Sequence, residues 1–142
     1  MATKIVIDAG HNGLSDPGAV YNGRRESDDT LRLAMAVGEI LSRSGYDVDY
    51  TRTGNINQSV IQKAQLANDT DADLFISIHR NMSEVPGSYH GVQSLVYDLN
   101  GQKLTMAEAI NKNLEGVGFR NINVEARPNL AVLRRTKIDR KS

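Results

Sequence analysis

Residues 4–26 read KIVIDAGHNGLSDPGAVYNGRRE and combine a short apolar run, a glycine-rich loop and a carboxylate that precedes a helix. The run IVI predicts a buried strand. The loop that follows it carries His11 and ends at Glu26. A second apolar run, residues 74–78, is followed directly by His79. Strands that each end in a histidine are typical of α/β enzymes that hold a ligand at the carboxyl edge of a sheet.

Outward from this stretch, apolar periodicity and turn residues predict alternating strands and helices. The expected helices are residues 26–45, 60–67 and 104–114, and the expected strands are residues 5–7, 46–50, 74–78, 92–97 and 130–133. The nearly continuous apolar strand 74–78 is expected in the centre of the sheet, covered on both faces. The pattern predicts an α/β fold, a single domain with a mostly parallel twisted sheet and helices on both faces.

The composition excludes several classes of protein. The 142 residues carry a formal net charge of zero, which gives no support to nucleic-acid binding. No stretch approaches the roughly 20 apolar residues of a membrane span. The first residues, MATK, do not form a secretion signal, so we expect either release from the cytoplasm by another route or a signal outside this sequence. Because cysteine is absent, any metal site must use nitrogen and oxygen ligands.

Three polar residues at the ends of the predicted elements are expected to lie close together in the fold. His11 and His79 each follow a strand, and Glu26 begins a helix that starts from the same edge. Two histidines and one glutamate with an open fourth position are the ligands of hydrolytic zinc sites. Taken singly, each histidine is equally consistent with a residue that caps a backbone carbonyl or faces solvent, and Glu26 is better explained as a helix N-terminal charge. Taken together, the three residues favour the metal site. His90 is interpreted as a surface loop residue.

The same residues give the chain a resemblance to a known family. The segments KIVIDAGHNG, DPGAVYNGRRE, GYDVDYTRT, DLFISIHRN, HGVQSLVYD and LAVLRRT cover almost the whole sequence. Together they resemble the zinc-dependent N-acetylmuramoyl-L-alanine amidases of the amidase-3 type, which occur in bacterial autolysins and phage endolysins. The combination is specific, whereas no single segment would be.

The resemblance implies that His11, Glu26 and His79 bind Zn²⁺ and that Asn81 contributes to substrate binding, although a turn residue is the favoured interpretation of Asn81 taken alone. It also implies a substrate, peptidoglycan, cut at the amide between N-acetylmuramic acid and the L-alanine of the stem peptide. In this family zinc polarises the amide carbonyl and activates water. The expected site of action is the bacterial cell wall.

The sequence departs from the family after about residue 136. The family continues with a strand that carries its catalytic glutamate in a V-E-x-G-F context, whereas this sequence reads KIDRKS and contains no such motif. Neither Glu125 nor Asp139 matches that position, so the catalytic residue is unknown. Losing a positioned general base typically costs about 10²- to 10⁴-fold in rate. Residues 1–142 are therefore expected to form an altered or truncated amidase domain with weak activity.

Two further expectations concern partners. An absent terminal strand would leave a sheet edge that can pair with a second copy, so self-association is predicted. The basic residues at 134–141 are interpreted as a solvated terminus rather than a binding patch. Two alternatives to the enzyme stay open: a non-catalytic, zinc-containing module that binds peptidoglycan, and a fold in which the histidines are incidental.

Overall fold

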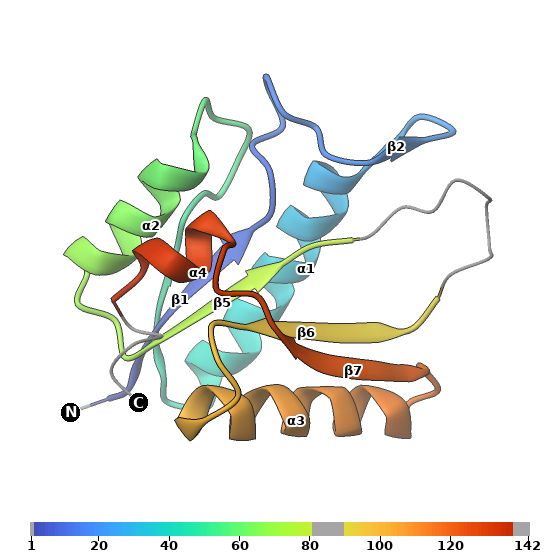
Figure 1. The fold of residues 1–142 in the computed structure, drawn as a ribbon. Helices are drawn as coiled ribbons and strands as arrows, with labels where there is room; N and C mark the ends of the chain where they lie inside the picture. The colour runs from blue at the N-terminus through green and yellow to red at the C-terminus, as the bar shows by residue number, and fades with distance from the viewer. Residues whose placement is uncertain (1, 81–89, 138–142) are drawn as a thin grey trace. The chain divides into compact units, whose positions relative to one another are not determined.

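The computed structural model describes residues 2–80 and 90–137 (Figure 1). The chain divides into two compact units, Met1–Asn81 and Met82–Ser142, and each is described by itself. The first unit contains all three residues of the expected metal site.

The first unit is built on three parallel strands. Strand β1 (Lys4–Ala9) lies in the middle, with β4 (Asp47–Tyr50) on one side and β5 (Leu74–Ile78) on the other. This confirms the predicted α/β fold with parallel strands. The prediction that residues 74–78 form the central strand was wrong for this sheet. The central strand is β1, which has the longer run of buried residues. All three strands end at the same edge.

Helices cover both faces of this sheet, as predicted. Helix α1 (Glu26–Arg43) packs its buried Ala34 against Ile5, Ile7 and Ala9 of β1. Successive side chains of a strand point to opposite faces, so Asp8 points the other way. There it meets α2 (Val60–Asp69), which the sequence predicted at residues 60–67.

The segment between β1 and α1, expected as loop alone, contains a small hairpin. Strands β2 (Val20–Tyr21) and β3 (Arg24–Arg25) pair in antiparallel fashion. The turn residues Asn22 and Gly23 have φ angles of 50° and 75°, the left-handed pair that a tight two-residue turn requires. The hairpin returns the chain to the sheet edge, where the Glu26 amide donates to the Ala19 carbonyl at 2.8 Å.

The second unit contains two parallel strands and a helix. Strands β6 (Val92–Val96) and β7 (Asn121–Ala126) pair directly, and α3 (Gly101–Gly116) packs against both. Strand β7 was not predicted. The predicted strand at residues 130–133 was wrong, because the chain there forms a short helix, α4 (Ala131–Arg135). Among the helices that the structure describes, none has the length and apolar character needed to cross a membrane.

Candidate metal centre

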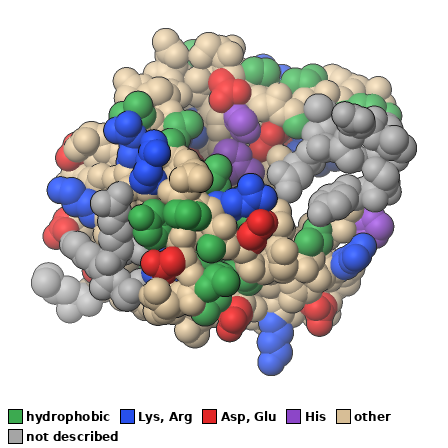
Figure 2. All heavy atoms as spheres, in the orientation of Figure 1, with side chains coloured by type: hydrophobic (Ala, Val, Ile, Leu, Met, Phe, Trp, Pro, Cys, Tyr) green, Lys and Arg blue, Asp and Glu red, His purple; other side chains and the backbone are tan. Residues whose placement is uncertain are grey.

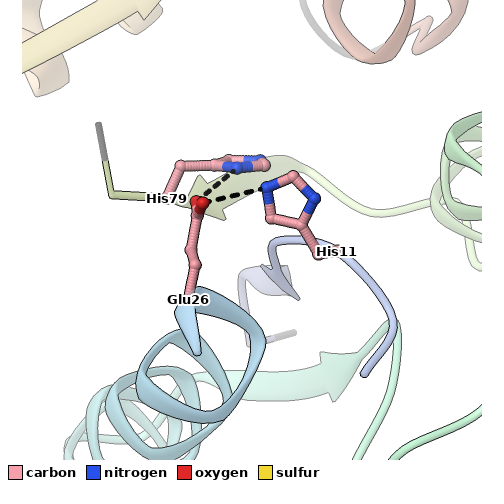
Figure 3. Close-up of side chains that lie close together, drawn as sticks. All are labelled: His11, Glu26 and His79. Carbon is pink, nitrogen blue, oxygen red and sulfur yellow. Dashed lines mark hydrogen bonds and ion pairs between the residues drawn. The ribbon is translucent and has the colours of Figure 1, made fainter. Parts of the chain in front are cut away.

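Three side chains converge at the carboxyl edge of the first unit (Figure 3). His11 follows β1, Glu26 is the first residue of α1, and His79 follows β5. The Nε2 atom of His11 lies 3.2 Å from one oxygen of Glu26, and the Nδ1 atom of His79 lies 3.2 Å from the other. One potential ligand atom from each residue lies within 4.8 Å of the other two. The expected convergence of these three residues is confirmed.

Glu26 is held as a buried carboxylate. Its side chain is only 3% exposed, and its two oxygens accept hydrogen bonds from the amides of Ala19, at 2.9 Å, and Arg80, at 2.8 Å. Burial raises the pKa of Glu26, but these two amides and the neighbouring histidines outweigh it, so the pKa lies below its ordinary value. The residue is therefore ionised at neutral pH, as a metal ligand must be.

The lowered pKa of Glu26 predicts how the metal-free protein responds to acid. A depressed carboxyl pKa contributes stability that is fully present above the unfolded value, 4.5, and is lost as the pH falls through the folded pKa. The free energy of unfolding should therefore fall as the pH decreases below 4.5. Denaturant titrations over this range should show a smaller decrease for Glu26→Gln. An equal decrease in both proteins would contradict the prediction.

Two buried cations hold the backbone that carries His11. His11 has a φ angle of 65°, a left-handed conformation that is uncommon outside glycine. Its carbonyl accepts hydrogen bonds from Arg52 Nε at 2.9 Å and from Lys63 Nζ at 2.7 Å. The same two atoms also bind the carbonyl of Ala9, at 3.2 Å and 2.6 Å. These contacts stabilise the strained backbone at the ligand.

Arg52 extends this support to the helix that carries Glu26. Its side chain is buried, and its NH2 group donates to the carbonyls of Gly10, at 3.0 Å, and Ser27, at 2.8 Å. One guanidinium thus connects the end of β1 to the first turn of α1. Arg52 and Lys63 were not predicted to be functional, because no local pattern in a sequence indicates which distant carbonyls a cation will bind.

Two glycines leave the space that the ligands occupy. A Cβ atom at Gly10 would lie 2.5 Å from Nδ1 of His79. At Gly18, where φ is 71°, it would lie 2.5 Å from Cδ2 of His11 and 2.6 Å from Oε2 of Glu26. Only glycine allows both rings and the carboxylate to approach this closely.

The arrangement suits a divalent zinc ion. Two imidazole nitrogens and one carboxylate oxygen are a common protein ligand set for zinc, and they leave a fourth position for water or substrate. The side chains of His11 and His79 are 24% and 46% exposed, so the site opens to solvent. Figure 2 shows histidine side chains at the surface of this face, with acidic atoms beside them. This geometry can bind an ion and admit a substrate from outside.

Four other residues were considered from the sequence. Asn81 and Asp139 lie outside the described residues. His90 is exposed, as expected for a surface residue. Glu125 lies on β7 in the second unit, where its Oε2 atom accepts hydrogen bonds from Gln93 and Arg127.

Comparison with known protein families gives one consistent result. The profile of a family described as N-acetylmuramoyl-L-alanine amidase matches residues 5–140. The endolysin of Bacillus phage SPP1 is 34% identical over 145 residues, covering 97% of this chain and 52% of the endolysin. A sporulation-specific N-acetylmuramoyl-L-alanine amidase of Bacillus subtilis (strain 168) is 36% identical over 120 residues, covering 82% of this chain and 45% of that protein.

The fold matches solved structures of similar proteins. An N-acetylmuramoyl-L-alanine amidase from Clostridium difficile 630 superposes with a TM-score of 0.88 at 26% identity, covering 97% of this chain and 76% of that one. The chain spans about half the length of the curated relatives described above.

Proposed function

Since this chain belongs to the N-acetylmuramoyl-L-alanine amidase family, we propose that it is a zinc-dependent amidase domain acting on peptidoglycan in the bacterial cell wall. The bond cut is the amide between N-acetylmuramic acid and the L-alanine of the stem peptide. The observation that carries the proposal is the cluster of His11, Glu26 and His79, whose potential ligand atoms lie within 4.8 Å of one another. Similarity to a phage endolysin and to a sporulation amidase supports a cell-wall substrate.

The residues of the site have distinct roles in this proposal. His11 offers Nε2 and His79 offers Nδ1, while the carboxylate of Glu26 offsets part of the charge of the ion. Bound zinc would supply Lewis-acid polarisation of the amide carbonyl and a more acidic water. The amides of Ala19 and Arg80 keep the Glu26 carboxylate in place before the ion arrives. Such preorganisation lowers the cost of assembling the site.

A second candidate function concerns residues 1–142 taken by themselves. The 142 residues contain no V-E-x-G-F motif, which is where the resemblance implies the general base. For these residues alone we propose turnover reduced by about 10²- to 10⁴-fold. The alternative is a non-catalytic module that holds zinc and peptidoglycan without cleaving it.

The test begins with the metal. Elemental analysis of protein loaded with zinc and then desalted should find one zinc per chain. His79→Ala should remove this zinc, because two ligands remain. His90→Ala is the matched control, since His90 is exposed and lies in the other unit, and it should keep the ion. No stoichiometric zinc in the unmodified protein would contradict the proposal.

Wall digestion separates the two candidates. Incubation with purified peptidoglycan should release free L-alanine amino groups with no matching increase in reducing ends. Co-sedimentation of the zinc-loaded protein with walls, without release, would favour the binding module. Self-association stays a prediction, and a single monomer peak in size-exclusion chromatography would count against it.

A further inference from the structure

The loop after β1 returns Asp16 to a position beside His11. The amides of Asn12 and Gly13 both donate to the Asp16 carbonyl, at 3.0 Å and 3.2 Å. The buried Asn12 side chain closes the turn, because its Oδ1 atom accepts from the amides of Leu14, at 2.8 Å, and Asp16, at 3.1 Å. Backbone contacts and Asn12 therefore set the position of Asp16, independently of its own carboxylate.

Each oxygen of the Asp16 carboxylate contacts a nitrogen atom of the surrounding loop. Oδ1 accepts from the Gly18 amide at 3.2 Å, and Oδ2 lies 2.8 Å from Nδ1 of His11. An ionised carboxylate can only accept, so the hydrogen of this contact belongs to Nδ1. A neutral imidazole carries a single N–H, which leaves Nε2 without a hydrogen. That atom faces Glu26 and the proposed ion.

We propose that Asp16 is a positioning residue that holds His11 in the tautomer protonated on Nδ1 and so keeps Nε2 free to bind metal. The inference rests on the proposed zinc site. Carboxylates that accept from the second nitrogen of a ligand histidine fix its orientation and raise its basicity. His79 faces Glu26 through Nδ1 instead, so the two histidines present different nitrogens. His79 therefore serves as an internal reference.

The tautomer can be measured directly in zinc-free protein. Long-range ¹H–¹⁵N correlation spectra, recorded where the imidazoles are neutral, should show His11 protonated on Nδ1. In Asp16→Asn we expect the single side-chain oxygen to accept the hydrogen bond from the Gly18 amide. The NH₂ group of the asparagine then faces Nδ1 of His11. His11 should then shift to the tautomer protonated on Nε2, while the His79 signals stay unchanged.

Zinc affinity provides the second measurement. Competition with a chelator should show a 10- to 100-fold weaker zinc affinity for Asp16→Asn, the approximate range for loss of such partners. Asp69→Asn is the matched control, because Asp69 is exposed and its Oδ1 atom accepts a hydrogen bond from Gln65 of its own helix at 2.8 Å. It should leave affinity and tautomer unchanged.

The outcomes separate this inference from the proposed function. His11 protonated on Nε2 in the unmodified protein would overturn the role of Asp16, whether or not the variant folds. Weaker zinc binding by Asp16→Asn with an unchanged tautomer would also overturn it, because Asp16 would then act through the loop. The expected tautomer and its shift in a protein that binds no zinc would support Asp16 while contradicting the metal site.

Discussion

Replacement of Lys63 by methionine is expected to lower the free energy of unfolding by about 3 to 5 kcal/mol. Lys63 Nζ lies 2.8 Å from Asp8 Oδ1, and the two side chains are 4% and 2% exposed. Methionine preserves the length of the side chain but leaves the carboxylate of Asp8 buried without its counter-charge. Removing one partner of a buried ion pair lowers the free energy of unfolding by much more than the intact pair contributes, because an uncompensated charge remains. Denaturant unfolding followed by circular dichroism measures this change.

Two further variants make the measurement specific. Lys4→Met removes a lysine that pairs with Asp47 and Asp49 near the surface, at 3.8 Å and 3.6 Å, and should cost less than about 1 kcal/mol. Adding Asp8→Asn to Lys63→Met should restore part of the loss, since the buried charge is gone. A loss for Lys63→Met no larger than that for Lys4→Met would show that Asp8 is not left uncompensated.

Lys63 also shows where the prediction from the sequence was incomplete. The predicted helix at residues 60–67 was correct, and its Ala64 and Ala67 are buried. Val60 and Ile61, the apolar residues that begin this helix, are exposed, whereas Lys63 is buried. Apolar spacing identifies a helix but does not reveal that its buried face carries a charge with a partner on another strand. The pairing with Asp8 depends on tertiary structure.

The second unit contains the clearest error in secondary structure. The apolar run at residues 130–133 was interpreted as a strand, although a run this short does not distinguish a strand from a buried helical turn. The true strand, β7, alternates apolar residues with asparagines that make cross-strand and helix contacts. Asn123 accepts from Gln93 Nε2 at 2.9 Å, and Asn121 accepts from the buried Asn111 at 3.1 Å. Side-chain hydrogen bonds stabilise this strand where sequence propensity does not.

The three residues of the candidate site were predicted from the sequence, whereas the residues that hold them in place were not. His11, Glu26 and His79 could be placed together because parallel strands end at one edge of a sheet. Arg52 could not be placed by that rule, since it binds backbone carbonyls contributed by residues far from it in the sequence. The ligands follow from topology, whereas their support follows from contacts that form only after folding.

Gly10→Ala is the second variant with a large expected effect, because it acts on both ligand geometry and strand spacing. The added Cβ would lie 2.5 Å from Nδ1 of His79 and 2.7 Å from the Ile78 carbonyl oxygen. The Gly10 amide also donates to that oxygen at 2.9 Å, so the backbone cannot move away without losing the hydrogen bond. We expect a loss of about 1 to 3 kcal/mol in the free energy of unfolding.

The same substitution should weaken zinc binding by at least about 10- to 100-fold, since the ring of His79 must leave its place. Gly54→Ala is the matched control: among the described residues, no atom outside Gly54 and its two chain neighbours lies within 4 Å of the added Cβ, and the φ of Gly54 is not in the left-handed region. Both variants restrict the unfolded chain equally, so their difference isolates the clash. Equal stability and equal zinc affinity in the two variants would mean that His79 can bind the ion from another position, and the close approach at Gly10 would then not define the site.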